Sequence, residues 1–212
     1  MSLNLFGHHV DWPARREPLA AGLRRLRPDV VALQEAVVDD TGDYSCGTVI
    51  AELAAPAPLG RLLVVSHGPS WAWWAEAERE LQALAVVRRI EELVADDPAH
   101  VDVGGDFNAT PDTSSMWFWT GRKSLDGTST AYRDCWESVH GADPGWTIDP
   151  GNPLTHLEER DANRGRRIDY LLVRCGDHGP SLRIADCRRV FDEPVGGVMA
   201  SDHYGVVADL TA

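Results

Sequence analysis

Seven short apolar runs constrain the fold of this chain more than any other feature. They are SLNLF, DVVALQEA, GRLLVVSH, HVDVGGD, RIDYLLVR, LRIADCRRVF and YGVVADL. Apolar runs of this length, bounded by turn-forming residues, are typical of buried strands. We therefore expect a protein built around β-sheet, with most strands covered on both faces.

Two longer segments lie between the apolar runs and predict helices. Residues 16–28 have Pro18 near the first turn and Pro28 where the helix must end. Residues 76–98 place apolar side chains at helical spacing before Pro98, namely Ala77, Leu81, Leu84, Val87, Ile90 and Val94. Strands alternating with helices favour an α/β fold with helices outside a layered sheet. The length of 212 residues fits one domain over residues 1–212.

The charge balance restricts the class of partner. The chain carries 33 acidic against 20 basic residues, a formal net charge of −13. Long nucleic acids are bound through many Lys and Arg contacts to phosphates, so this balance disfavours them as partners. A group of unpaired carboxylates would instead suit a divalent cation.

The sequence predicts a cytoplasmic protein. No apolar stretch approaches the roughly 20 residues that span a bilayer, and the first residues do not resemble a secretion signal. The four cysteines show no C-x-x-C spacing, which argues against a structural zinc site and favours reduced thiols.

Polar side chains recur at the ends of the predicted strands. Within VGGDFN, Asp106 and Asn108 are two residues apart, so an extended chain would aim both into one cleft while Phe107 packs behind. Asp169 lies inside an apolar strand, where a carboxylate needs a cation, a donor or a metal. Each residue alone would be an ordinary turn or capping residue. Their repetition along the strands predicts one shared site.

Four of these motifs together resemble a known family. LQEA, GGDFNATP, RIDYLLV and SDHYGVVADL occur in the order found in the endonuclease/exonuclease/phosphatase superfamily. The resemblance spans nearly the whole chain. It implies a four-layered α/β sandwich, with two mixed β-sheets face to face, helices outside, and a divalent-metal site between the sheet ends.

The resemblance also implies roles for individual residues. Glu35 would be the principal ligand of Mg²⁺, for which Mn²⁺ can substitute, assisted by Asn4 and Asp202. Mg²⁺ prefers oxygen ligands and retains several waters, so few protein carboxylates suffice.

The remaining motif residues would act on the substrate. The resemblance gives Asp106 the role of positioning or deprotonating the attacking water, and Asn108 that of a donor to the phosphoryl group. His203 would contact the scissile phosphate and be oriented by Asp169, while His67 matches a second phosphate-side position. A histidine beside a carboxylate stays protonated near neutral pH, as a phosphate partner must.

One segment departs from the family pattern. Only residues 37–58 lie between the strand of Glu35 and the strand of His67, where family members have tens of residues more. Either one sheet edge is shortened, or the chain lacks residues between Val38 and Cys46. No acidic partner for His67 can be named from this segment.

Tryptophan and arginine residues offer a substrate surface. Of eight tryptophans, Trp117 and Trp119 follow the GDFN motif, and we weigh substrate contact against loop anchoring evenly for them. The earlier cluster at residues 71–74 is expected to pack against the start of the second helix. NRGRR ends in Arg166 and Arg167, a basic pair that either holds a phosphate, with Arg167 as the selected candidate, or is simply solvated.

The favoured function is a Mg²⁺-dependent phosphodiesterase or phosphatase acting on a phosphorylated small molecule or a lipid headgroup by metal-assisted water attack. The first alternative is a metal-dependent nuclease or abasic-site endonuclease, which the motifs allow and the net charge disfavours. The second is a non-catalytic binding module on the same fold, consistent with the shortened segment.

Overall fold

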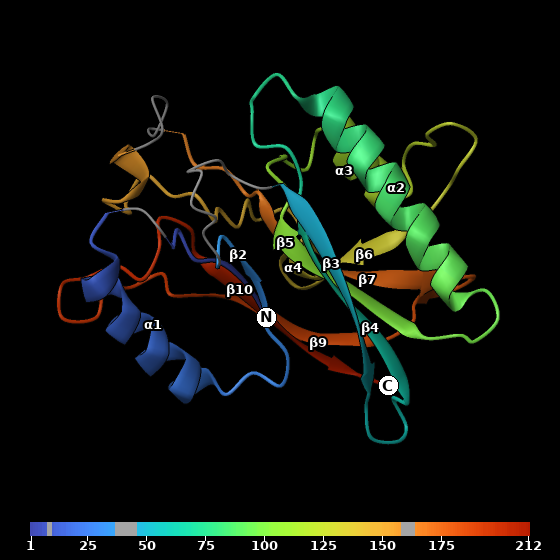
Figure 1. The fold of residues 1–212 in the computed structure, drawn as a ribbon, viewed down its shortest axis with the longest axis horizontal. Helices are drawn as coiled ribbons and strands as arrows, with labels where there is room; N and C mark the ends of the chain where they lie inside the picture. The colour runs from blue at the N-terminus through green and yellow to red at the C-terminus, as the bar shows by residue number, and fades with distance from the viewer. Residues whose placement is uncertain (8–9, 37–45, 158–163) are drawn as a thin grey trace.

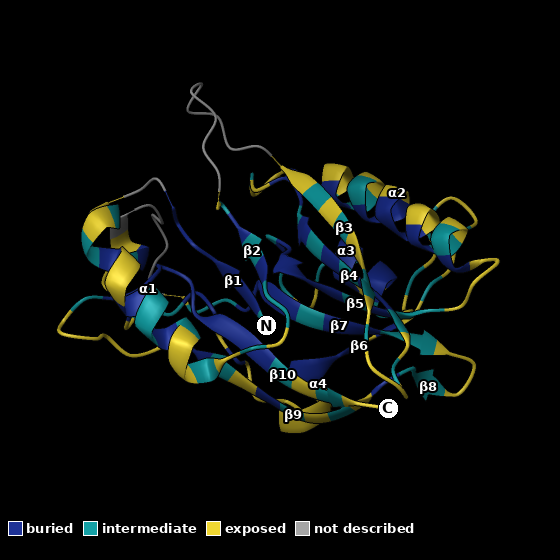
Figure 2. Ribbon diagram, turned by 60° about the horizontal axis from the view of Figure 1, so that its bottom comes forward, coloured by how far each residue is buried: buried dark blue, intermediate teal, exposed yellow. Residues whose placement is uncertain are grey.

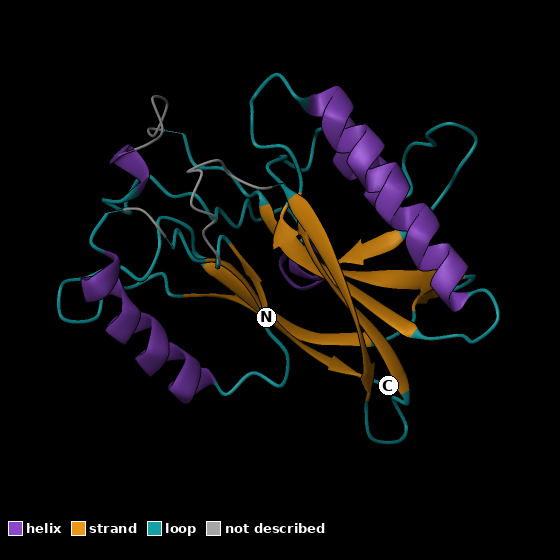
Figure 3. Cartoon of the chain, in the orientation of Figure 1, coloured by secondary structure: helices purple, strands orange, loops and turns teal. Residues whose placement is uncertain are grey.

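Two mixed β-sheets form the centre of the protein (Figures 1 and 3). The computed structural model describes residues 1–7, 10–36, 46–157 and 164–212. The four-stranded sheet has the order β2 (Ala32–Gln34), β1 (Ser2–Asn4), β10 (Gly205–Thr211) and β9 (Arg183–Val190). The six-stranded sheet has the order β3 (Gly47–Ala54), β4 (Arg61–Gly68), β5 (His100–Asp106), β7 (Asp169–Gly176) and β6 (Tyr132–Asp134), with β8 (Gly179–Pro180) paired to β7.

Helices cover the outer faces of both sheets. Helix α1 (Trp12–Leu26) packs on the four-stranded sheet, while α2 (Glu76–Val94) and α3 (Ser114–Trp119) pack on the six-stranded sheet (Figure 1). The short helix α4 (Cys135–His140) packs against β7 and β9, and a 3₁₀ turn covers Thr155–Leu157. The predicted four-layered α/β sandwich is confirmed. No described helix is long and apolar enough to cross a bilayer.

The central strands are largely buried (Figure 2), and alternation of their side chains divides the core into layers. On β7, Tyr170 and Leu172 belong to the core beneath α2, while Val173 packs toward the four-stranded sheet. Successive residues of a strand point to opposite faces. Asp169 therefore shares the face of Val173 and lies between the sheets, opposite to Tyr170 as its sequence context predicts.

A glycine lets the two sheets approach closely. A Cβ atom at Gly104 of β5 would lie 2.9 Å from Leu171 Cδ2, 3.3 Å from Ser2 Cβ and 3.4 Å from Ala32 Cβ. Ser2 and Ala32 belong to the opposing sheet. A larger residue at this position would push the sheets apart next to the end of β5, where Asp106 lies.

The expectations for the two long helices differ from the structure in two places. Helix α1 begins at Trp12 with a proline in its first turn, so Pro18 lies inside the helix instead of at its start. Leu81 of α2 is exposed, because Ala83 and Val86 face the sheet in its place.

Strand β3 was not predicted. It forms the edge of the six-stranded sheet and its side chains are largely exposed, so it lacks the apolar run by which the other strands are recognised. The stretch between Val38 and Cys46, where residues were thought to be absent, lies almost wholly outside the described residues.

The buried carboxylate of Asp102 generates a stability prediction. Its Oδ1 atom is buried and accepts no hydrogen bond from the described residues. Burial raises the pKa of Asp102 from 3.8 to about 7. The folded state thus binds more protons than the unfolded state between these values, and stability falls as the pH rises through this window.

We expect Asp102→Asn to raise the unfolding free energy at pH 8 by about 1 kcal/mol or more, because a neutral amide replaces a desolvated charge. Urea unfolding at pH 5 and pH 8 measures this, with the exposed Asp96→Asn as control. Equal pH dependence in wild type and Asp102→Asn would contradict the expectation.

Candidate functional site

Polar residues from both sheets meet at one end of the sandwich. Asp106 ends β5 and is directly paired with Asp169 at the start of the antiparallel strand β7. In the other sheet, Asn4 ends β1, and Glu35 directly follows the parallel strand β2. Antiparallel pairing of β1 with β10 brings His203, which precedes β10, to the same end. Strand direction and register therefore gather residues that are far apart in the sequence.

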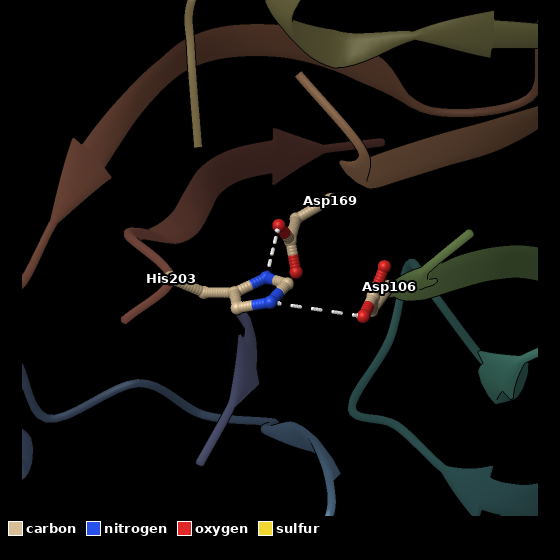
Figure 4. Close-up of side chains that lie close together, drawn as sticks. All are labelled: Asp106, Asp169 and His203. Atoms are coloured by element: carbon tan, nitrogen blue, oxygen red, sulfur yellow. Dashed lines mark hydrogen bonds and ion pairs between the residues drawn. The ribbon is translucent and has the colours of Figure 1, made fainter. Parts of the chain in front are cut away.

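His203 and two aspartates form the centre of the site (Figure 4). His203 Nδ1 is 2.8 Å from Asp169 Oδ2, and its Nε2 is 3.9 Å from Asp106 Oδ2. One potential ligand atom from each residue lies within 4.8 Å of the others, a spacing that also allows a metal ion. All three side chains are buried.

Backbone contacts hold this centre in place. Thr147 Oγ1 accepts hydrogen bonds from the amides of Ile168 and Asp169, both at 3.2 Å. Ser201 Oγ accepts one from the His203 amide and donates one to the Asn4 carbonyl at 2.7 Å. The hydroxyl of Ser201 thus links the SDH turn to strand β1.

The charges around His203 favour its protonated form. Burial alone would lower the pKa of His203, but Asp169, Asp202 and Asp106 outweigh it and raise the pKa well above 6.5. Burial also raises the pKa of Asp106 to about 7, against the opposite influence of His203. A protonated imidazole cannot ligate a metal through the same nitrogen, so the geometry fits a proton-donating histidine held by Asp169.

Asn4 connects the carboxylates of the two sheets. Its Nδ2 atom lies 3.1 Å from Glu35 Oε1 and 3.0 Å from Asp106 Oδ2, donating to both, and its Oδ1 accepts from the Phe6 amide at 2.9 Å. The amide therefore presents its donor side to the carboxylates, which differs from the metal-ligand role expected for it.

Two carboxylates that share one amide concentrate negative charge in a small volume. Such oxygen donors are the ligands that a hard divalent cation prefers, so this end of the sandwich fits a Mg²⁺-type ion. Asp169 Oδ1 adds a buried oxygen with no hydrogen-bond partner among the described residues. Asp202 lies beside this group, where its Oδ1 accepts from Ser201 Oγ at 3.2 Å.

Asn108 lies beside Asp106 for a reason other than the one expected. Its φ of 51° is left-handed, so the chain is not extended here and the two-residue alternation does not apply. Asp106 Oδ1 accepts the Asn108 amide at 2.9 Å, and Asn108 Nδ2 donates to the Pro69 carbonyl at 3.2 Å. A turn closed by the aspartate side chain replaces the extended segment. Phe107 is buried in the core as predicted.

His67 lies on the other face of the sheet. It is paired with Gly105, which directly precedes Asp106 in β5, so the His67 and Asp106 side chains point to opposite faces. Val65, two residues before His67 in β4, packs in the core beneath α2, and His67 shares this face. The ring is 1% exposed, packs edge-on against Phe107 and Trp119, and its Nδ1 is 2.7 Å from Thr48 Oγ1. Burial lowers the pKa of His67 to about 3. The structure therefore gives His67 a neutral, packed setting instead of the phosphate-side position expected from the motif.

Of the two arginines that end NRGRR, Arg166 lies near Asp106 and Asp169, whereas Arg167 does not contact the site. Arg167 is buried and its Nη1 lies 2.5 Å from Asp134 Oδ2, so it belongs to an internal ion pair. The backbone of Arg166 pairs with Ile148, which also pairs with His203. Burial lowers the pKa of Arg166, and the nearby carboxylates of Asp106 and Asp169 offset this effect only in part.

The two tryptophan clusters reverse the expected pattern. Trp119 is fully buried among aromatic rings and anchors the core, whereas Trp117 is partly exposed on α3. Trp71, Trp73 and Trp74 were expected to pack against α2 but are all exposed. Burial of Trp119 removes it from the candidate substrate surface.

Two contributors to the site were not identified from the sequence. Thr147 and Ser201 act through backbone contacts that no motif reveals, although Ser201 belongs to the SDH run. Arg166 was named with Arg167 in NRGRR, but only Arg167 was selected as a site residue, because the sequence does not show which of two successive side chains faces the site.

Comparisons with known proteins identify the family of the chain and the fold that it shares with solved structures. A sequence model of the Endonuclease/Exonuclease/phosphatase family matches residues 1–203. No curated protein matches the chain.

Solved structures share the fold at low sequence identity. A truncated TDP2 from Caenorhabditis elegans has a TM-score of 0.73 and 17% identity, over 100% of this chain and 96% of that chain. TDP2 from D. rerio, complexed with single strand DNA product, has a TM-score of 0.76 and 18% identity, over 100% and 97%. An endonuclease/exonuclease/phosphatase from Bacteroides vulgatus has a TM-score of 0.62 and 17% identity, over 99% and 96%.

The His203–Asp169 contact predicts an unusual titration. We expect the His203 ring of the metal-free protein to stay protonated well above pH 6.5, and Asp169→Asn to move its pKa back down because the main opposing charge is removed. The stabilisation from this contact is complete below the ordinary histidine pKa and is lost as the pH rises through the raised one.

Imidazole NMR across pH 5–10 measures this titration in the wild type and in Asp169→Asn. A wild-type His203 that titrates near 6.5 would contradict the charge arrangement described above.

The two neighbouring arginines should behave differently when truncated. Arg167→Ala leaves Asp134 buried without its cation, so we expect a loss of roughly 3–5 kcal/mol in unfolding free energy. Arg166→Ala should cost clearly less, because Arg166 is only partly buried. Denaturant titration of both variants decides this, and equal losses would count against the assignment.

Proposed function

The chain belongs to the endonuclease/exonuclease/phosphatase family, and from this we propose that it hydrolyses phosphoester bonds with the help of a divalent cation. The observation that supports the proposal most is the buried His203, held by Asp169 beside the carboxylates of Asp106 and Glu35. Hydrolysis of a phosphoester requires charge stabilisation and alignment more than covalent chemistry. The site offers a proton donor, a proton acceptor and cation-binding oxygens within a small space.

The proposed cation is Mg²⁺, with Mn²⁺ as a substitute. Glu35 is the proposed principal ligand, with Asp202 as a further carboxylate. When bound, the cation would neutralise the phosphoryl oxygens and align the substrate. Because Asn4 already uses its oxygen on the Phe6 amide, we assign it to holding Glu35 and Asp106 in position.

The protein side chains divide the remaining work. His203 donates a hydrogen bond from Nε2 to a phosphoryl oxygen, and Asp169 fixes the ring through Nδ1. Asp106 orients the attacking water and accepts its proton, for which a pKa of about 7 is suitable near neutral pH. Asn108 is the proposed second donor to the phosphoryl group, while no substrate role is proposed for His67.

The identity of the substrate is a separate matter. The preference for a small-molecule or lipid-linked phosphate rested on the net charge of −13. D. rerio TDP2, which shares the fold, is complexed with single strand DNA product. A phosphodiester is therefore the group we propose for cleavage, with a nuclease-type substrate favoured by the structural comparison.

This proposal predicts metal-dependent cleavage of a simple phosphodiester. We expect wild type to hydrolyse bis(4-nitrophenyl) phosphate with Mg²⁺ or Mn²⁺ and to lose this activity in EDTA. Glu35→Gln and His203→Ala should each lower kcat by about 100-fold or more, because each removes charge stabilisation of the transition state.

The exposed Glu92→Gln and His156→Ala provide matched controls that should keep wild-type rates. The same background rate in wild type and in both site variants, on diester and monoester substrates alike, would refute the proposal.

A further inference from the structure

Three large aromatic side chains stand on the surface within four residues. Trp71, Trp73 and Trp74 are 60%, 65% and 79% exposed, and together we call them the tryptophan rim. Tryptophan side chains are highly buried on average, because exposure of the large apolar ring to water is unfavourable. A close group of exposed rings therefore indicates a binding surface more than a packing element.

The segment that carries the tryptophan rim is held rigidly. The buried Arg79 donates from Nη1 to the carbonyls of Ser70 at 3.0 Å and Ala72 at 2.8 Å, and pairs with Glu76 at 2.8 Å. The Ser70 amide donates to Gln82 Oε1 at 2.9 Å. These bonds fix the backbone from within, so the exposed rings are presented on a preformed scaffold.

The tryptophan rim adjoins the candidate active site. The carbonyl of Pro69, two residues before Trp71, accepts a hydrogen bond from Asn108 Nδ2 at 3.2 Å. On the other side, the guanidinium of Arg166 lies 4.5 Å from the centre of the Trp73 ring. The backbone of Arg166 forms a β-bridge with Ile148, and Ile148 forms a second β-bridge with His203. A ligand phosphate at His203 would thus have Arg166 and then Trp73 next to it.

We propose that the tryptophan rim and Arg166 form a subsite that stacks a nucleobase beside the scissile phosphate of a short single-stranded segment. This inference rests on the proposed function, because it places the reacting phosphate at His203. Every nucleobase has a flat π face that stacks on an aromatic side chain, and an arginine stacked on the same ring adds contact to phosphate. The net charge of −13 disfavours a long contact along the phosphate backbone, so the proposed contact is local to this subsite.

A lipid surface fits the same rings less well. Arg166 covers part of the Trp73 ring, so insertion of that ring would carry a charge toward hydrocarbon.

Binding in the absence of metal tests the subsite without turnover. A fluorescently labelled single-stranded tetranucleotide is titrated with protein in EDTA, next to the same oligomer in which tetrahydrofuran residues replace the bases. We expect wild type to bind the oligomer with bases at least about 5-fold more tightly, the lower range of one stacked base.

The double variant Trp73→Ala/Trp74→Ala should lose this difference, and Arg166→Ala should weaken both oligomers. Leu81→Ala, which truncates an equally exposed apolar side chain on α2, should match wild type. Thermal melting verifies that all variants remain folded.

Two results would overturn the inference. One is equal binding of both oligomers by wild type and the double variant. The other is wild-type binding to neutral phosphatidylcholine vesicles that the double variant loses, with no difference between the oligomers. Hydrolysis of bis(4-nitrophenyl) phosphate separates the two proposals, since its absence in wild type refutes the proposed function while the binding comparison still judges the subsite.

Discussion

One amide group ties the two sheets together at the site. Asn4 ends a strand of the four-stranded sheet, and its Nδ2 donates both to Glu35 in that sheet and to Asp106 in the other. This contact requires the sheets to lie close together at that end, which the absence of a side chain at Gly104 allows. A change in sheet separation would therefore alter the distance between these two carboxylates, and with it the His203–Asp169 contact that also joins the sheets. The packing between the two sheets therefore determines the distances between the site residues.

The site is strongly acidic for its degree of burial. Asp106 and Asp169 lie around the single imidazole of His203, and Glu35 lies a short distance away. Burying several carboxylates is unfavourable unless cations compensate for the lost solvation. The surrounding carboxylates raise the pKa of His203, whereas the pKa of Asp106 is raised mainly by burial, with a smaller contribution from the charge of Asp169. A site with this balance gains stability when a divalent cation binds and gives up protons as it does so.

The buried strands could be predicted from the sequence. The exposed edge strand, and the face of the sheet on which some side chains lie, could not. Strand β5 matches its apolar run from His100 to Asp106, because only a strand covered on both faces has such a run. Strand β3 has one partner and a solvated surface, so its pattern is weak. His67 and Arg167 were placed on the wrong side for a related reason. A motif shows that a side chain is near a strand end, whereas its face depends on where pairing begins, and one residue of uncertainty reverses the direction. The exposure of Trp73 depends on Arg79 holding a loop, a long-range contact without a local pattern.

The backbone at two site residues has an energetic consequence. Glu35 and Asn108 both have a φ of 51°, a left-handed conformation that asparagine tolerates better than glutamate does. Holding a glutamate in this conformation costs on the order of 1 kcal/mol that glycine would not cost. Selection for thermal stability alone would favour glycine after β2, so the glutamate there indicates that stability has been exchanged for a carboxylate at that point. Substitutions chosen to stabilise this protein should therefore leave Glu35 unchanged. A choice based only on backbone energy would replace it by glycine early.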